Sequence, residues 1–330
     1  MKAITYSHYG PPEVLQVKTI AKPVPKDDEV LIKVQAAEAT KSDCELRSFT
    51  YAVNWFWLPL RIAFGITKPR RQVLGGYFAG QIESIGKDVN QFSAGQHVFG
   101  CTQFRFGAYG EYIALPQSYS MVTKPQNMNF AEAAAVPLGG INALHFLRHA
   151  KIQAGEKVLI NGAGASIGAH AVQIAKAMGA EVTAVDSAIK KDFLFRIGAD
   201  HFIDYTEEDC LDNGHKYDVI FNMVPHSSYS AAINSLNPHG RYLIGNPRLS
   251  VMLRSVLTKH FSDKTAIFAF AKETKEELTA LKQMIEKGKI RSIVDRVYTM
   301  EQAAEAHHRV ETEQRKGAIV IAIGDTEQGD

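Results

Sequence analysis

Short apolar runs alternate with helical stretches between residues 157 and 270, and this alternation restricts the possible folds more than any other feature of the sequence. The strand-like runs are KVLIN (157–161), EVTAV (181–185), HFI (201–203), YDVIF (217–221), RYLIG (241–245) and AIFAF (266–270). Strands that alternate with helices are typical of a parallel sheet covered by helices on both faces. We therefore predict an α/β fold with a doubly wound parallel sheet.

A glycine-rich string, NGAGASIG (161–168), directly follows the first of these strands and opens a helix. Small residues let a backbone approach a pyrophosphate, and a helix N-terminus offers free N–H groups and the positive end of the helix dipole. The glycine spacing is one residue longer than G-x-G-x-x-G, so the string alone also suits a tight turn without a ligand. In its context we interpret it as the pyrophosphate site of a dinucleotide. The predicted binding residues are Gly162, Gly164, Ala165, Ser166, Ile167 and Gly168.

The end of the second strand carries opposing signals about the cofactor. Asp186 stands where an acid accepts hydrogen bonds from the adenosine ribose, which favours NAD. Ser187 and Lys190 follow it and are able to hold a 2′-phosphate, which favours NADP. The alternative for Lys190 is a solvated helix start without a ligand. The residues by themselves leave this choice open.

The first 120 residues or so have a different texture, with short β-like runs separated by Gly and Pro. These runs, at 1–6, 29–36, 80–85, 97–99 and 109–114, indicate a β-rich, barrel-like domain. Residues 130–150 are Ala-rich and helical in period. The tail has predicted helices at 272–287 and 300–310 and predicted strands at 292–297 and 318–323. Because the parallel sheet already has six strands, we expect the last strand to return to the first domain, and we predict domains of 1–123 with 290–330, and of 124–289.

Length and composition agree with a globular protein of two domains. The chain has 330 residues, of which 45% are apolar and 22% charged, and its net charge is +2. So small a charge provides no field to attract nucleic acid or an anionic membrane, and we expect neither as a partner. The N-terminal residues lack an apolar signal core, and Cys44, Cys101 and Cys210 form no disulfide framework. We therefore expect a cytoplasmic protein.

Residues 51–66, YAVNWFWLPLRIAFGI, are strongly apolar. The segment is shorter than the ~20 residues that span a bilayer, and Asn54, Pro59 and Arg61 interrupt it, so we expect no stable membrane insertion. We interpret it either as a buried or interface segment or as an apolar cover over a substrate cleft.

A family resemblance extends over most of the chain. The residues INGAGASIGAHAVQIAKAMGAEVTAVDS (160–187) and IGADHFIDY (197–205) are similar to the nucleotide-binding core of the medium-chain dehydrogenase/reductase superfamily, in its zeta-crystallin-like quinone oxidoreductase branch. Segments 43–47, 74–89, 106–116, 133–144 and 288–307 fit the same branch. The resemblance implies a GroES-like catalytic domain, built from the N-terminal residues and the tail, beside a central Rossmann domain. It also implies a nicotinamide cofactor in the cleft between them.

The resemblance assigns further residues to the cofactor. Ser187, Lys190 and Tyr205 match positions near the adenosine phosphate, which favours NADPH and keeps NADH as the alternative. In this arrangement Asp186 is turned away or is held by the helix N-terminus that follows it. The remaining implied contacts are Asn142, at the nicotinamide end, and Asn222, Val224 and Gly245, at the ends of strands.

The candidate catalytic residues are Thr40, Lys41, Asp43 and Arg47, because their segment faces the cleft in this family. For Asp43 and Arg47 the alternative is a structural ion pair. The chain departs from the branch at Thr40, Glu45, Ala165, Ser166 and Pro225, where related proteins have Asn, Tyr, Gly, Gly and Gly.

We predict no metal. Gly76 stands where the zinc alcohol dehydrogenases of the superfamily have a histidine, and Cys44 alone cannot hold a catalytic zinc. The pairs His145–His149 and His307–His308 lack further ligands, and we interpret them as ordinary surface or packed histidines.

Without a Lewis acid, hydride transfer suits an activated acceptor better than a simple ketone. We therefore predict an NADPH-dependent enzyme that reduces a small hydrophobic quinone or α,β-unsaturated carbonyl. The alternatives are a metal-free alcohol or aldehyde dehydrogenase and a non-catalytic NADPH-binding structural protein. We also expect a homodimer, because the apolar run 265–270 resembles an unpaired edge strand and related proteins pair their sheets there.

Overall fold

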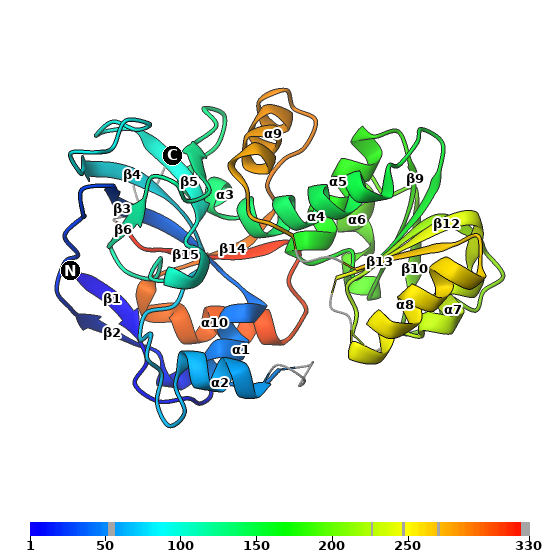
Figure 1. The fold of residues 1–330 in the computed structure, drawn as a ribbon, viewed down its shortest axis with the longest axis horizontal. Helices are drawn as coiled ribbons and strands as arrows, with labels where there is room; N and C mark the ends of the chain where they lie inside the picture. Colours follow the sequence, from blue (N-terminus) through cyan, green and yellow to red (C-terminus); the bar gives the residue numbers. More distant parts are fainter. Residues whose placement is uncertain (52–56, 226, 246–247, 269–270, 325–330) are drawn as a thin grey trace.

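The computed structural model describes the chain except for residues 52–56, 226, 246–247, 269–270 and 325–330 (Figure 1). Two domains lie side by side, and a parallel sheet forms the centre of one of them. Its strand order is β10-β9-β8-β11-β12-β13, and every neighbouring pair is parallel. The strands are β8 (Lys157–Asn161), β9 (Glu181–Asp186), β10 (His201–Asp204), β11 (Tyr217–Asn222), β12 (Leu236–Ile244) and β13 (Thr265–Phe268). The predicted doubly wound parallel sheet is confirmed, although the last two residues of the predicted run 266–270 lie outside the described residues.

Helices cover both faces of this sheet. The central strand β8 is apolar throughout because its side chains are buried alternately on one face and the other. Val158 and Ile160 belong to the core beneath α4 and α5, whereas Leu159 belongs to the core beneath α7. Figure 1 shows α4 and α5 on one side of the sheet and α7 and α8 on the other. The helices are α4 (Pro137–Ala150), α5 (Ser166–Ala177), α6 (Lys191–Arg196), α7 (Tyr229–Asn234), α8 (Leu249–Phe261) and α9 (Lys275–Glu286).

The strand order reverses between β8 and β11, and this reversal positions the site. The chain runs outward from β8 to β9 and β10 and then returns to the other side of β8 with β11. In open parallel sheets a crevice forms at the carboxyl ends of the strands at this switch point, and ligands bind there.

The other domain is built on a seven-stranded sheet of order β14-β15-β3-β4-β5-β7, with β6 paired to β3. The strands are β3 (Glu29–Ala39), β4 (Tyr77–Ile85), β5 (His97–Cys101), β6 (Tyr112–Pro116), β7 (Met121–Thr123), β14 (Val294–Tyr298) and β15 (Ala318–Ala322), beside the hairpin β1 (Lys2–Thr5) and β2 (Gln16–Thr19). The helices are α1 (Lys41–Ser48), α2 (Trp57–Phe64), α3 (Phe130–Ala134) and α10 (Ala303–Glu311).

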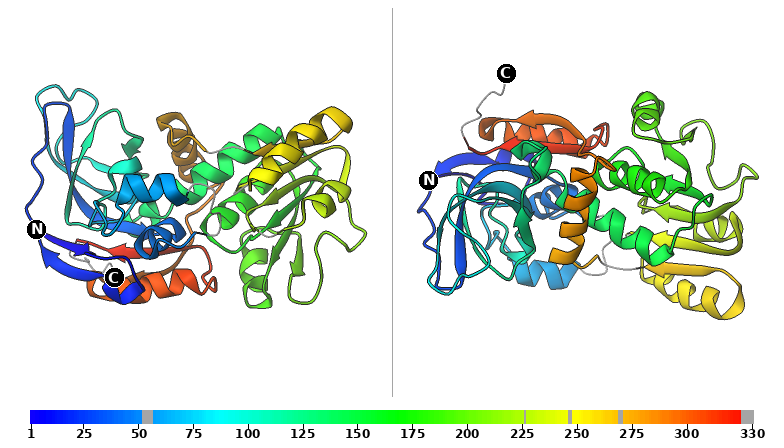
Figure 2. Two further views of the ribbon diagram at one scale, coloured as in Figure 1. Left: turned by 60° about the horizontal axis from the view of Figure 1, so that its bottom comes forward. Right: turned by 90° about the horizontal axis from the view of Figure 1, so that it is seen from above.

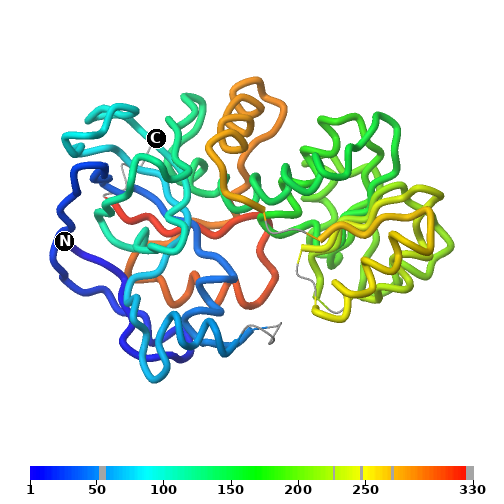
Figure 3. Tube along the Cα trace, in the orientation of Figure 1, coloured from blue at the N-terminus to red at the C-terminus, as the bar shows by residue number. Residues whose placement is uncertain are grey.

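The tail returns to this first domain, as expected. Strand β15 pairs antiparallel with β3, and Figure 3 shows the red end of the chain beside the blue and cyan segments. Figure 2 shows the two domains as separate lobes from two further directions. The predicted domain boundaries at 123/124 and 289/290 remain predictions.

The apolar segment 51–66 is mostly unburied where the structure describes it. Helix α2 contains no buried residue, and Leu58 and Ile62 are more than half exposed, so the interpretation as a buried segment is wrong for these residues. Tyr51 lines the cleft between the domains, which agrees with the interpretation as a cover. Of the helices in the described parts of the chain, none is both long and apolar enough to span a membrane.

Candidate active-site cleft

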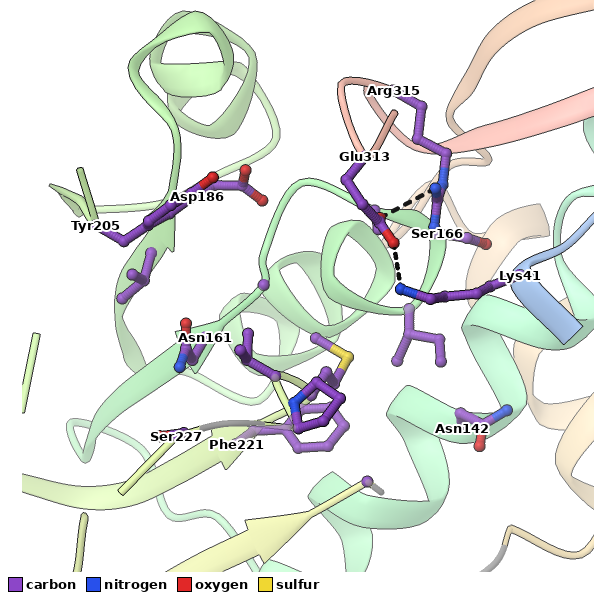
Figure 4. Close-up of a pocket in the computed structure, with 18 of the residues that line it drawn as sticks. Lys41, Asn142, Asn161, Ser166, Asp186, Tyr205, Phe221, Ser227, Glu313 and Arg315 are labelled. Atoms are coloured by element: carbon purple, nitrogen blue, oxygen red, sulfur yellow. Dashed lines mark hydrogen bonds and ion pairs between the residues drawn. The ribbon is translucent and has the colours of Figure 1, made fainter. Parts of the chain in front are cut away.

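A cleft of about 1230 Å³ lies between the two domains at the carboxyl ends of the parallel strands (Figure 4). It is lined by the predicted residues Thr40, Lys41, Asn142, Gly162, Ala165, Ser166, Ile167, Asp186, Lys190, Tyr205, Val224 and Gly245. The other predicted residues are not part of this lining and are Asp43, Arg47, Gly164, Gly168, Ser187 and Asn222.

The glycine-rich loop has the geometry of a phosphate-binding turn. Gly162 has a positive φ of 89°, which favours glycine. A Cβ on Gly168 would lie 2.3 Å from the Gly162 carbonyl oxygen, so the first turn of α5 packs directly on the loop. Ala165 precedes α5 and provides no side-chain cap, so the first N–H groups of this helix are available to an anion.

The tail of the chain braces the same loop from the other domain. The Gly317 N–H donates to the Gly164 carbonyl oxygen at 2.9 Å, and Gly317 forms a parallel bridge with Ala165. The loop is therefore fixed to both domains, and its position defines the floor of the cleft.

The end of β9 holds a buried ion pair. The Lys190 ammonium lies 2.8 Å from Asp186 Oδ1 and donates to the Glu313 carbonyl oxygen at 2.8 Å. Asp186 also accepts from the Gly164 N–H at 2.7 Å and from the Ser187 N–H at 2.9 Å. The interpretation of Lys190 as a solvated helix start is wrong, because only 3% of this residue is exposed.

Two consequences follow for the adenosine end of the cleft. The Asp186 carboxylate is held by the start of the following helical turn, as the family resemblance implied, and its charge is offset by Lys190. Tyr205 is 61% exposed, lines the cleft and offers an open aromatic face (Figure 4).

The strand ends β8 and β11 are joined by their asparagines. Asn161 Nδ2 donates to Asn222 Oδ1 at 2.9 Å, and Asn222 Nδ2 donates to the Val224 carbonyl oxygen at 3.0 Å. Asn161 lines the cleft, whereas Asn222 is buried behind it. Asn222 therefore supports the wall and does not form its surface.

Helix α1 begins with a capping box, in which the side chain of Thr40 and that of Asp43 each accept a hydrogen bond from the other residue's backbone N–H. The Asp43 N–H donates to Thr40 Oγ1, and the Thr40 N–H donates to Asp43 Oδ2, both at 3.1 Å. Asp43 Oδ1 accepts from the Gly75 N–H at 3.0 Å, and burial raises the pKa of the Asp43 carboxyl against these hydrogen bonds. Asp43 thus fixes the helix start and the loop at Gly75.

Arg47 has partners other than the expected Asp43. Its guanidinium pairs with Glu311, donates to the Gly10 carbonyl oxygen at 3.1 Å and lies 3.1 Å from His307 Nδ1. Arg47 therefore ties α1 to α10, and the expected ion pair with Asp43 is wrong. Of the four catalytic candidates, the structure brings Thr40 and Lys41 to the cleft, and Lys41 pairs there with Glu313 (Figure 4).

Several polar residues of the cleft were absent from the sequence-based candidates, among them Glu38, Tyr77, Glu273 and Arg315. Glu38 is 1% exposed, and its Oε2 has no hydrogen-bond partner among the described residues. Burial raises the pKa of its carboxyl to about 8, although the Ser166 hydroxyl and the Arg315 guanidinium oppose the rise. A glutamate within the apolar run of β3 was the available signal for this residue.

The described residues contain no group of three or more His, Cys, Asp or Glu side chains placed to hold a metal ion. The rings of His145 and His149 contact each other in a tilted arrangement with centroids 4.3 Å apart, and His145 contacts Glu277. His307 is buried against Tyr109, and His308 contacts Glu13 at the surface. Each of the four histidines therefore has a packing or surface partner of its own.

Comparisons with known proteins agree with this architecture. The model of the alcohol dehydrogenase GroES-like domain matches residues 26–126, and the model described as zinc-binding dehydrogenase matches residues 197–321. The quinone oxidoreductase of Sus scrofa is 32% identical over 323 residues, which cover 94% of each chain. The chain belongs to the quinone oxidoreductase branch of the medium-chain dehydrogenase/reductase superfamily.

Other members of the superfamily extend this comparison. The quinone oxidoreductase from Coxiella burnetii has the same fold, with a TM-score of 0.87 and 27% identity over 98% of this chain and 99% of its own. The NADPH-dependent alkenal/one oxidoreductase, chloroplastic, of Arabidopsis thaliana is 29% identical and covers 97% of this chain and 79% of its own. This quinone oxidoreductase family member therefore matches its relatives over both domains.

Proposed function

We propose that this chain is an NADPH-dependent oxidoreductase that delivers hydride to a quinone or an α,β-unsaturated carbonyl without a metal ion. The observation that carries the proposal is the interdomain cleft, which contains the uncapped N-terminus of α5 and the glycine-rich loop before it. Gly168 of α5 packs so closely on this loop that a Cβ there would clash with it. An NADPH molecule fits this donor set, because its pyrophosphate would be held at the uncapped N-terminus of α5. When bound, NADPH supplies the hydride.

The adenosine end favours NADPH for an electrostatic reason. A free carboxylate at the end of β9 would bind ribose hydroxyls and repel a 2′-phosphate, but Asp186 is already satisfied by Lys190 and by two backbone N–H groups. Lys190 keeps one further donor for a phosphate, and the exposed Tyr205 can cover the adenine ring. NADH is the weaker partner in this proposal.

The proposed acceptor class rests on how each type of acceptor takes up hydride and on the names of the relatives. A simple ketone needs a strong acid or a metal to polarise its carbonyl, whereas a quinone or enone accepts hydride by conjugate addition. The names of the Sus scrofa and Arabidopsis thaliana relatives state these two acceptor classes. The non-catalytic alternative, a nucleotide-binding structural protein, predicts cofactor binding without turnover.

An acceptor screen tests the proposal. Metal-depleted protein is mixed with NADPH or NADH and with matched quinones, enones, simple ketones and secondary alcohols. We expect NADPH oxidation with quinones or enones, little with simple ketones, and no gain on adding zinc. Turnover of simple alcohols, activity that requires zinc, or tight NADPH binding with no turnover on any acceptor would each contradict it.

We also propose that the protein is a cytoplasmic homodimer. Cys44, Cys101 and Cys210 are buried free thiols, which suits a reducing compartment. Strand β13 is an edge strand of the parallel sheet, so its outer backbone groups are able to pair with a second copy. Beside it, α8 exposes Leu253 and Leu257 by 66% and 56%, which a partner would cover.

A further inference from the structure

Tyr77 and Glu273 form a polar pair that crosses the cleft. The Tyr77 hydroxyl donates to Glu273 Oε1 at 2.8 Å, and both side chains line the cavity. Tyr77 is the first residue of β4 in the catalytic domain, whereas Glu273 lies between β13 and α9, where the chain leaves the parallel sheet. The two domains therefore meet through this hydrogen bond.

The surroundings hold the pair in one place. The Ser120 hydroxyl donates to the Glu273 carbonyl oxygen, and Cys101, which pairs with Tyr77 in the sheet, lies against the Glu273 carboxyl. Both tyrosine and carboxyl are therefore oriented by neighbours on β4, β5 and the loop before β7, which is the arrangement that efficient proton transfer needs.

Burial disfavours the charged form of both groups. Burial raises the pKa of the Glu273 carboxyl, against the hydrogen bonds from Tyr77 and Cys101. Burial and the nearby Glu273 charge raise the pKa of the Tyr77 hydroxyl well above its ordinary value. Glu38 also acts on Tyr77 and Cys101, and its charge raises the pKa of both groups further.

The pair lines the same cleft as Asn142, the predicted contact at the nicotinamide end. The loop at Ser166 would hold the pyrophosphate and Tyr205 the adenine, so the opposite end of a dinucleotide extends along α4 towards the catalytic domain. Leu138, Asn142 and Phe146 of α4 line the cleft, as Tyr77 and Glu273 do.

We propose that Tyr77 is the proton donor for reduction of an α,β-unsaturated carbonyl and that Glu273 returns a proton to it, an inference that rests on the proposed function. A bound nicotinamide would supply the hydride for a new C–H bond at the β-carbon, and the π electrons of the C=C bond would then form an enolate. The O–H bond of Tyr77 then breaks as its proton forms the C–H bond at the α-carbon. Glu273 reprotonates the tyrosinate and takes a proton from water, so the sum is enone, NADPH and one proton to saturated ketone and NADP⁺.

Reduction of a quinone differs from reduction of an enone in the atom that receives the proton. Hydride addition to a quinone leaves a hydroquinone anion, whose proton goes to oxygen and comes readily from water. An enolate carbon is protonated more slowly and benefits from a positioned acid, which typically contributes about 10²-fold or more. Tyr77 is therefore required for enones and dispensable for quinones.

Tyr77→Phe tests this division, with Tyr112→Phe on β6, outside the cleft, as the matched control. We expect Tyr77→Phe to lower kcat on an enone by about 10²-fold and to leave kcat on a quinone within about threefold. In deuterated water the parent places deuterium on one face of the α-carbon, and Tyr77→Phe gives a mixture of faces. NADPH affinity by fluorescence titration and the melting temperature report whether the variant is folded and still binds the cofactor.

The outcomes separate the possible errors. An equal loss on enone and quinone, or no loss on the enone, overturns the proton-donor role, as does unchanged deuterium placement in Tyr77→Phe. If Tyr77→Phe does not fold, Glu273→Gln keeps the hydrogen bond but cannot return a proton, and it must slow the enone reaction selectively. If the parent protein reduces neither acceptor, the proposed function fails, and the role of Tyr77 fails with it.

Discussion

At the scale of single residues, the effect of a buried ionisable side chain of the cleft on the free energy of unfolding depends on whether that side chain is protonated. Glu38 is the clearest case, because it stands fully buried in β3 between Arg315 and the start of α5. A buried carboxyl resists ionisation, so it favours the folded state only while it carries its proton. Glu38 therefore makes stability depend on pH.

Glu38→Gln should remove this dependence. The pKa of Glu38 rises from an ordinary 4.5 to about 8 on folding, so its stabilising contribution is complete below 4.5 and is lost as the pH rises through 8. As the pH rises through that window, we expect the parent to lose up to about 1.4 kcal/mol of its free energy of unfolding per pH unit relative to Glu38→Gln. Denaturant unfolding at several pH values measures it, with the exposed Glu83→Gln as control. Parallel curves for parent and Glu38→Gln would refute the assignment.

Lys190 is the residue on which cofactor choice depends. Because its ammonium offsets the Asp186 charge and holds the Glu313 carbonyl, Lys190→Ala should weaken both dinucleotides and weaken NADPH more. One charge-assisted contact to a phosphate contributes roughly tenfold in affinity, which is the expected extra loss for NADPH. Fluorescence titration of both cofactors tests this, with the exposed neighbour Lys191→Ala as control. An equal loss of both, or a parent that prefers NADH, would show that the pair is only structural.

At the scale of elements, periodic apolar runs predicted the parallel strands well because a strand buried on both faces must be apolar throughout. The predicted helix over 130–150 is two helices, since Pro137 starts α4 after α3 has ended. The glycine string was placed correctly on a strand-to-helix turn. By contrast, Tyr77 and Glu273 are 196 residues apart, and nothing local in the sequence indicates that two such positions meet across a cleft.

The junction between the loop and α5 offers a sharp test of the pyrophosphate site. In Gly168→Ala the new methyl group would lie 2.3 Å from the Gly162 carbonyl oxygen and 2.6 Å from Ala163, so the loop must move. We expect NADPH affinity to fall by at least about tenfold. Gly76→Ala is the control, because a Cβ there meets nothing within 4 Å. Unchanged affinity in a folded Gly168→Ala protein would place the cofactor elsewhere.

At the scale of the whole molecule, the cleft exists because the tail of the chain returns to the first domain and braces the loop of the second. Gly317, just before β15, makes that contact with Gly164. Two arguments predicted this return: the parallel sheet already had six strands, and the family resemblance implied the wrapping. The periodicity of the tail by itself showed only two strands and two helices. The order of the strands, and hence which residues face the cleft, is a property of tertiary contacts.

The assembly prediction also belongs to this scale. Light scattering should report a particle of twice the 36.4 kDa chain mass at micromolar concentration, because edge strand β13 and the exposed apolar residues of α8 need a cover. Leu257→Glu should shift the equilibrium towards the monomer. A monomeric parent, or a dimer unaffected by charges on α8, would contradict this interface.

The central proposal is hydride transfer in the cleft without a metal ion, and one measurement tests it most directly. NADPH that carries deuterium at the reactive carbon of the nicotinamide is mixed with metal-depleted protein and an enone, and the product is analysed by mass spectrometry and NMR. We expect one deuterium at the β-carbon of the saturated ketone. A product without deuterium, deuterium at the carbonyl carbon, or transfer that appears only after zinc is added would contradict the account.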